Sequence, residues 1–264
     1  MTPSALGDIT RGTTNPNRLR RIDRWMLHAV CPIIRSSQDP IVVDLGYGAT
    51  PVTTQEMFLR FRKHVRSDVE VVGIEIDPER VSQASAVEQP GLSFRYGGFE
   101  VPLPDSRKPI AIRAFNVLRQ YDESEVTKSW EIMTKRLAVE GFLVEGTCDE
   151  IGRRSSWVSL RGQASAPESF TISLHVGSLE KPSDIAPRLP KALIHRNVPG
   201  EQIYDFLQEF DRAWLGNSAM IPFGARQRWV ATIEALRSSY PILDNKVRWR
   251  LGEVSIPWDV VAPN

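Results

Sequence analysis

The strongest constraint on the fold of this 264-residue chain is an apolar run that ends in an acid and two glycines. Residues 41–45 read IVVDL, with Asp44 as the acid, and Gly46 and Gly48 follow. Central strands of parallel sheets are buried on both faces and appear as such continuous apolar runs. Glycine lets the backbone turn sharply against a ligand where a Cβ would collide. The sequence therefore predicts a buried strand that leads into a ligand-binding loop.

A second apolar run, residues 71–77, comes about one helix and one strand later and contains Glu75. The carboxyl ends of neighbouring parallel strands meet at one edge of the sheet, so Glu75 is expected beside the first loop. A carboxylate there can accept two hydrogen bonds from a ribose diol. Asp77 precedes Pro78, a residue that suits the first position of a helix, and is expected to cap that helix. The two runs together predict a nucleotide pocket.

Two kinds of nucleotide loop fit this pattern in part. A dinucleotide loop, G-x-G-x-x-G, has its third glycine where this chain has Pro51, which offers no N–H to a pyrophosphate. The proline disfavours a nicotinamide-dependent oxidoreductase. Asp44, two residues before Gly46, instead fits the pattern D/E-x-G-x-G-x-G, although Thr50 stands at the last glycine of that pattern.

With these motifs the chain resembles class I S-adenosylmethionine-dependent methyltransferases over roughly residues 40 to 150. Four segments carry the resemblance in the family's order, namely residues 44–48, 73–77, 112–118 and 138–146. The resemblance implies that S-adenosylmethionine is the cofactor and that its binding residues are Asp44, Gly46, Tyr47, Gly48, Glu75, Ile76 and Phe99. Asp44 would fix the loop and the ammonium end of the methionine moiety. Where many relatives carry an acid near the adenine, this chain reads RYGGFE, and Phe99 is expected to stack on the base.

Methyl transfer from a sulfonium depends mainly on alignment, and a base is needed only when the acceptor must lose a proton early. The segment around the fourth strand reaches the edge where the methyl group would lie, so Arg113 and Asn116 are the candidate catalytic residues. The alternatives are a turn cap for Asn116 and a salt bridge to Asp122 or Glu145 for Arg113. The acceptor is unassigned. A non-catalytic relative that keeps the fold as a binding or regulatory module is the alternative function.

The expected fold is α/β, a doubly wound, mostly parallel, Rossmann-like sheet with right-handed crossovers and antiparallel C-terminal strands. After residue 150, two segments alternate with period two and predict antiparallel strands, at residues 156–160 and 170–176. Residues 247–256 alternate as well, and are the candidate for the antiparallel seventh strand of the resembled family.

The expected organisation has three parts. Residues 1–40 form an N-terminal arm and helix, and residues 41–177 form the cofactor-binding core. Residues 178–264 add a helical elaboration and the C-terminal strand, which completes the same domain. Within the first part, residues 1–17 lack apolar periodicity and predict a mobile arm.

Five arginines and one acid lie between Arg11 and Arg24. One interpretation is a solvated entry into a helix at about residues 18–30, capped by Asn17. The other is a lid over the cofactor or a patch for an anionic or nucleic-acid ligand. Because the net charge of the chain is only +1, any basic binding surface has to be local.

Other functional classes find little support. No apolar run approaches the ~20 residues of a membrane span, so the protein is expected to be soluble and cytoplasmic. The two cysteines, Cys31 and Cys148, are far apart, and the four histidines form no pair at helical spacing. We therefore expect no metal site.

Overall fold

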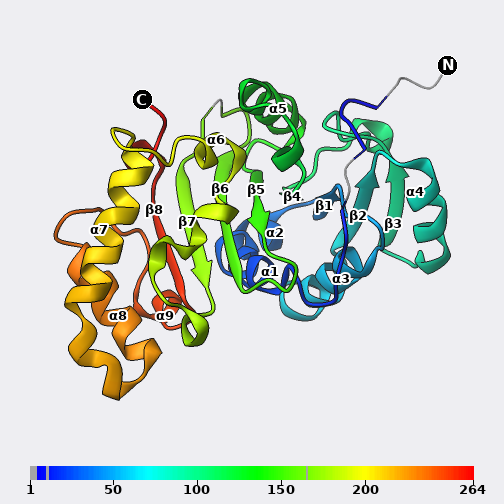
Figure 1. Ribbon diagram of the computed structural model, residues 1–264. Helices are drawn as coiled ribbons and strands as arrows, with labels where there is room; N and C mark the ends of the chain where they lie inside the picture. The colour runs from blue at the N-terminus through cyan, green and yellow to red at the C-terminus, as the bar shows by residue number, and fades with distance from the viewer. Residues whose placement is uncertain (1–4, 10–11, 165) are drawn as a thin grey trace.

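The computed structural model describes residues 5–9, 12–164 and 166–264, and its strands form a single sheet in the order β3-β2-β1-β4-β5-β6-β7-β8 (Figure 1). Strands β1 to β5 pair in parallel, and β5 to β8 pair in the antiparallel sense. The expected mostly parallel, Rossmann-like sheet with antiparallel C-terminal strands is confirmed. The strands are β1 Ile41–Leu45, β2 Glu70–Glu75, β3 Leu92–Tyr96, β4 Ala111–Phe115, β5 Phe142–Cys148, β6 Arg154–Arg161, β7 Ser169–Leu174 and β8 Glu253–Pro257.

Helices cover both faces of the sheet, as a doubly wound fold requires (Figure 1). One face packs against α1 Arg20–Ala29, α2 Cys31–Ser36, α3 Val52–His64 and α4 Pro78–Ala84. The other packs against α5 Glu123–Arg136, α6 Lys191–Ile194, α7 Gln202–Gly216 and α8 Ala225–Leu236. All five residues of β1 are buried, which is why that strand appears in the sequence as an unbroken apolar run with one acid.

The C-terminal strand differs from its prediction. Residues 156–160 fall in β6 and residues 170–174 in β7, whereas residues 175 and 176 follow β7. The last strand, β8, lies at the edge of the sheet, as expected, but it pairs with β7, and the antiparallel neighbour of β5 is β6. The strand is also shorter than residues 247–256, because α9 Lys246–Trp249 takes up its first part. The Asn245 side chain accepts a hydrogen bond of 2.9 Å from Val247 N and so caps α9. A cap and one helical turn thus interrupt the alternating pattern.

Of the expected helix caps, the one at Asp77 is confirmed and the one at Asn17 is wrong. The Asp77 carboxylate accepts a hydrogen bond of 2.9 Å from Glu79 N, as a cap of α4 should. Asn17 does not cap α1, whose N-cap residue is Leu19 with no side-chain bond. Asn17 has a φ of 62°, and this left-handed turn lets its side chain accept from Arg60 on α3 instead.

The sheet continues past residue 177, because β8 pairs with β7. The division of the chain at residues 40 and 177 stays a proposal. None of the helices within the described residues is both long enough and apolar enough to cross a membrane.

Candidate functional site

The loop after β1 and the acid at the end of β2 meet directly. Glu75 is 1% exposed, and its Oε2 accepts a hydrogen bond of 2.9 Å from Gly48 N. Its Oε1 accepts from Ile76 N at 3.0 Å and from Asp77 N at 3.3 Å. Because each carboxylate oxygen has about two lone-pair sites, Oε2 can accept one further hydrogen bond. The two sequence motifs therefore build one site, in which Oε2 has one acceptor position that no described residue uses.

Both glycines of the loop are required by their surroundings. Gly46 has a φ of +68°, and a Cβ there would lie 2.5 Å from Val117 Cγ2. Gly48 has a φ of +83°, and a Cβ there would lie 2.7 Å from Thr14 Oγ1. Left-handed backbone and close neighbours together exclude larger residues. The loop therefore keeps this backbone shape only with glycine at both positions.

Tyr47, between the glycines, anchors this loop. Its ring meets Phe94 of β3 edge to face, with 5.3 Å between centroids, and its hydroxyl donates to Arg80 O at 3.3 Å. Burial, followed by the nearby Glu75 carboxylate, raises the pKa of the Tyr47 hydroxyl, so this group stays neutral. The side chain therefore fixes the loop against β3 and α4.

Two adjoining cavities lie at this edge of the sheet. Both are lined by Leu45 and Gly46, so they are two ends of one groove. We name them after the strands that they follow. The β2 cavity is lined mainly by Glu75, Ile76, Gly97, Gly98, Phe99 and Tyr121. The β4 cavity is lined mainly by Asp44, Tyr47, Gly48, Thr53, Phe115 and Asn116.

Arg113 does not line either cavity, and its predicted place in a reaction chamber is wrong. Its side chain is 0% exposed within β4, where it forms a buried salt bridge. Nε and Nη2 bind the two Asp44 oxygens at 2.9 and 2.6 Å, and Nη1 binds Asp23 of α1. Asp122 and Glu145, the partners named by the alternative, are not involved. Arg113 instead ties α1 to the strand below the glycine loop.

Asp44 lines the β4 cavity, but much of its carboxylate is already used. Besides Arg113, its Oδ2 accepts a hydrogen bond of 2.7 Å from Thr54 Oγ1 at the start of α3. Arg113 Nη2 also donates to Thr53 O at 3.1 Å. Asp44 therefore joins β1, β4 and α3 below the loop, and its contact with an ammonium group remains a proposal.

Asn116 follows β4 and lines the β4 cavity. It has a φ of 61°, a left-handed conformation that asparagine tolerates better than most residues. Its Oδ1 accepts from Cys148 N at 3.0 Å and its Nδ2 donates to Cys148 Sγ at 3.3 Å. Burial raises the pKa of the Cys148 thiol, which therefore stays protonated. These contacts hold the amide at the edge of the cavity in one orientation.

Phe99 and Ile76 both line the β2 cavity, as their predicted roles require. The Phe99 ring lies 5.3 Å from the ring of Tyr121, between centroids. The next residue, Glu100, accepts hydrogen bonds from Gly98 N at 2.9 Å and from Leu6 N at 2.8 Å. The acid after β3 thus binds the chain's own N-terminal segment.

The sequence indicated only part of that segment, because a lid over the cofactor was one interpretation of residues 11–24, whereas residues 5–9 and 12–14, expected in a mobile arm, are bonded to the folded core. Leu6, Gly7 and Asp8 line the β2 cavity, and Gly12, Thr13 and Thr14 line the β4 cavity. Figure 1 shows this chain, in dark blue, passing in front of β1 and β2 before it enters α1. For residues 5–9 the sequence signal is Gly98, because a Cβ there would lie 2.0 Å from Leu6 O.

The described arginines of the basic run divide among three places, and Arg21 donates to Ser173 Oγ and Leu251 O rather than lining a cavity. Arg11 lies outside the described residues, and Arg18 lines the β4 cavity. The exposed Arg20 and Arg24 instead line an open concavity on α1 and α3. Its other residues are Leu27, His28, Arg60, His64, Arg248 and Leu251, with no acid among them.

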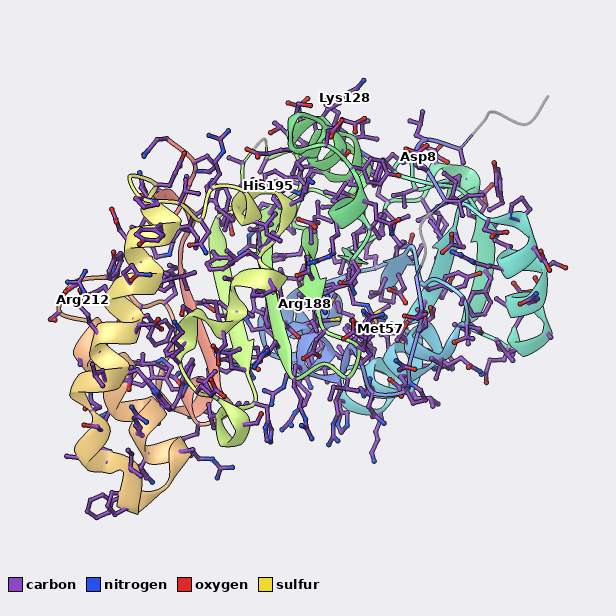
Figure 2. All side chains as sticks on the ribbon, viewed as in Figure 1. Asp8, Met57, Lys128, Arg188, His195 and Arg212 are labelled. Atoms are coloured by element: carbon purple, nitrogen blue, oxygen red, sulfur yellow. The ribbon has the colours of Figure 1, made fainter. Side chains whose placement is uncertain are left out.

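Other titratable groups lie away from the groove. His195 follows α6, pairs with Lys191 Nζ at 3.1 Å and lies across α5 from Asp8 (Figure 2). Glu145 of β5 is fully buried, and its one hydrogen-bond donor is Trp130 Nε1 at 3.3 Å. Within the described part of the chain, no group of three or more His, Cys, Asp or Glu side chains could hold a metal ion.

The groove lies at the carboxyl ends of the strands, which is where open α/β sheets bind ligands. The sequence matches no protein family and no curated protein. The structure is similar to the plantazolicin methyltransferase BamL in complex with S-adenosylhomocysteine, at 17% identity and a TM-score of 0.37 over 49% of this chain and 46% of that chain.

It is also similar to the plantazolicin methyltransferase BpumL, at 11% identity and a TM-score of 0.40 over 51% and 48% of the two chains. A third similar structure is the CMeT domain of the citrinin polyketide synthase, at 19% identity and a TM-score of 0.35 over 42% and 30%. This chain thus spans less than half the length of these proteins. At these identities the similarity describes the fold alone.

Proposed function

We propose that the protein is an S-adenosylmethionine-dependent methyltransferase whose acceptor is not yet identified. The observation that carries the proposal is the groove in which the Asp44–Gly48 loop, Glu75 and Asn116 converge. The loop has a backbone shape that a Cβ at either glycine would prevent, and the Glu75 carboxylate has an acceptor position that no described residue uses. Both features suit a nucleoside joined to an amino acid. S-adenosylmethionine, when bound, supplies a methyl group that is already activated for transfer.

The β2 cavity would hold the adenosine. Oε2 of Glu75 has one acceptor position for a ribose hydroxyl, and its other contacts keep the carboxylate in place. Ile76 and Phe99 line this cavity and would offer apolar surface to a flat base. The residues of this cavity therefore bind and orient, and take no part in the chemistry.

The β4 cavity would hold the methionine moiety and the reacting atoms. Asn116 is its candidate positioning group, because Cys148 fixes the amide while each amide atom retains one further hydrogen-bonding position. Good alignment at this place is the main requirement for transfer. No residue has to act as a base unless the acceptor loses a proton early.

A dinucleotide fits this loop poorly. Pro51 is the N-cap residue of α3, at the position where a pyrophosphate would need a backbone N–H. Titration calorimetry with S-adenosylmethionine, S-adenosylhomocysteine and NAD tests this directly. We expect the two sulfur compounds to bind and NAD not to bind. Binding of NAD alone would contradict the proposal.

Glu75→Gln tests the ribose contact. Loss of a charged acceptor should weaken S-adenosylhomocysteine binding by about 1 to 3 kcal/mol. The matched control is Glu79→Gln on α4, whose exposed carboxylate lies outside both cavities and should leave the affinity unchanged. Equal affinities for wild type and Glu75→Gln would remove Glu75 from the site.

Catalysis needs its own test, because a non-catalytic relative would also bind the cofactor. Transfer of a labelled methyl group to a component of a cell extract, lost in Glu75→Gln, is the expected result. Cofactor binding without transfer to any class of acceptor would favour a binding or regulatory protein.

The basic concavity next to Arg18 suits an anionic acceptor or a nucleic acid. Arg20 and Arg24 are exposed there and form no salt bridge with any described acid. If a nucleic acid binds, its affinity should fall steeply with salt, and Arg20→Ala with Arg24→Ala should reduce the salt dependence. Binding that is absent or independent of salt would exclude this surface.

A further inference from the structure

We propose that the N-terminal strap, residues 5–9 and 12–14, together with Arg18, completes the cofactor site by closing the groove and binding the carboxylate of the methionine moiety. This inference rests on the proposed function. It concerns residues outside the motifs that led to that function.

The strap is attached at the outer edges of both cavities. Over the β2 cavity, Leu6 O accepts a hydrogen bond of 3.0 Å from Phe99 N, Leu6 N donates to Glu100, and Asp8 N donates to the Tyr121 hydroxyl. These contacts make residues 6–8 part of the wall of the β2 cavity, together with Glu75 and Ile76. An adenosine in this cavity would therefore contact both the strap and the end of β2.

Over the β4 cavity the strap bonds to the glycine loop itself. Thr14 Oγ1 donates to Tyr47 O at 2.7 Å, and Gly12 O accepts from Ala49 N at 3.0 Å. These bonds use Tyr47 O and Ala49 N, while Gly48 N is bonded to Glu75. The strap thus covers the groove and leaves the cofactor contacts of the loop in place.

Arg18 is the charged group that this part of the chain brings to the β4 cavity. Its guanidinium is half-buried and donates to three backbone carbonyls, those of Thr13, Cys148 and Asp149, the last at 3.0 Å. It forms no salt bridge with any described carboxylate. A guanidinium in a partly closed cavity favours an anionic partner, and the methionine moiety carries one carboxylate.

The strap and Arg18 are also coupled, because Arg18 donates to Thr13 O. A carboxylate bound by Arg18 would stabilise the docked strap, and the docked strap would keep water and solvent ions from the carboxylate. Cofactor binding and strap docking should therefore reinforce each other.

The first experiment compares two ligands on Arg18→Met. S-adenosylhomocysteine has the carboxylate, and 5′-methylthioadenosine lacks it. Loss of a charge-assisted contact should weaken S-adenosylhomocysteine binding about 10- to 100-fold and leave methylthioadenosine binding unchanged. Arg35→Met is the matched control, because Arg35, on α2, also donates to backbone carbonyls. This substitution should change neither affinity.

The second experiment loosens the strap at both ends with the double variant Thr14→Val and Tyr121→Phe, which keeps side-chain size. Dissociation of S-adenosylhomocysteine, followed by stopped flow, should become about tenfold faster or more, since two hydrogen bonds of the closed state are lost. An unchanged or slower dissociation would overturn the inference, and tighter binding would mean that the strap competes with the cofactor.

The two proposals fail in different ways. If the wild-type protein binds neither S-adenosylmethionine nor S-adenosylhomocysteine, the proposed function is wrong. If it binds them and Arg18→Met loses equal affinity for both test ligands, or none, the function stands and the role of Arg18 is refuted.

Discussion

Two buried acidic regions of the sheet are built in opposite ways. Below the glycine loop, Asp23 and Asp44 share the Arg113 guanidinium, and Arg60 adds a second cation beside Asp23. Below α5, Glu145 receives one hydrogen bond from Trp130, and its Oε1 has no partner among the described residues. Buried carboxylates beside Arg113 have cationic partners, whereas Glu145 has none among the described residues and its neutral form is favoured.

The pKa values follow from this difference. Burial raises the pKa of both Asp23 and Glu145, because it disfavours the charged form. At Asp23 the Arg113 and Arg60 cations oppose the effect. At Glu145 only the Trp130 hydrogen bond opposes it, and the pKa reaches about 8. Glu145 is thus mostly neutral at pH 7.

The largest expected effect comes from breaking the paired region. Arg113→Met leaves two buried carboxylates without their shared cation and should lower the free energy of unfolding by about 3 to 5 kcal/mol. Urea unfolding measures it. Arg107→Met is the control, since Arg107 forms a partly exposed pair with Asp39 and Glu70 and should cost about 0 to 1 kcal/mol. Similar losses in both variants would show that the buried ion pairs of Arg113 contribute no more to the free energy of unfolding than the partly exposed ones of Arg107.

The second prediction concerns the unpaired region. The folded-state pKa of Glu145, about 8, lies above its ordinary value of 4.5. Its contribution to stability is therefore fully present below pH 4.5 and is lost as the pH rises through 8. Glu145→Gln removes this loss, so the variant should gain up to about 5 kcal/mol relative to wild type between pH 4.5 and pH 9.

The quantity to measure is the difference between the two unfolding curves at each pH, because other groups then cancel. Any cost of the new amide is independent of pH and shifts the whole difference equally. A difference that stays constant from pH 5 to pH 9 would refute the neutral state of Glu145.

A smaller effect is expected from the hydroxyls around Asp44. Thr54→Val removes a donor at 2.7 Å from Oδ2 and should cost about 1 to 2 kcal/mol of unfolding free energy. Thr53→Val provides the matched comparison, since its hydroxyl lies 3.5 Å from the same oxygen, and should cost less. The reverse order would mean that these contacts do not stabilise Asp44.

The smallest effect is expected at Arg60, whose side chain is 19% exposed. Arg60→Met should cost about 1 kcal/mol, because Asp23 keeps Arg113 and solvent reaches the removed charge. Thermal unfolding of the single variants and of the double variant with Arg113→Met gives the coupling between the two cations. Equal costs for Arg60→Met and Arg113→Met would mean that Asp23 depends on both alike.

Much of the groove could be predicted because its parts are local in sequence. The Asp44–Gly48 loop and Glu75 each follow a buried strand, and parallel pairing of β1 with β2 brings the ends of these strands together. Likewise, the caps at Asp77 and Asp122 depend only on residues one turn away. The predicted C-terminal strand was wrong in its first half, because a single cap at Asn245 outweighed the alternating pattern.

By itself, the sequence determined the Rossmann-like sheet, the glycine loop and the acid that meets it, since strand burial and backbone freedom leave a periodic or glycine signature. Only the tertiary structure decided that Arg113 is structural, because its partners Asp23 and Asp44 lie 90 and 69 residues away. It also placed the strap over the groove. A lid at residues 11–24 was one interpretation of the sequence, but residues 5–9 are held by bonds to distant residues and leave no periodic pattern, so only the folded chain reveals their place.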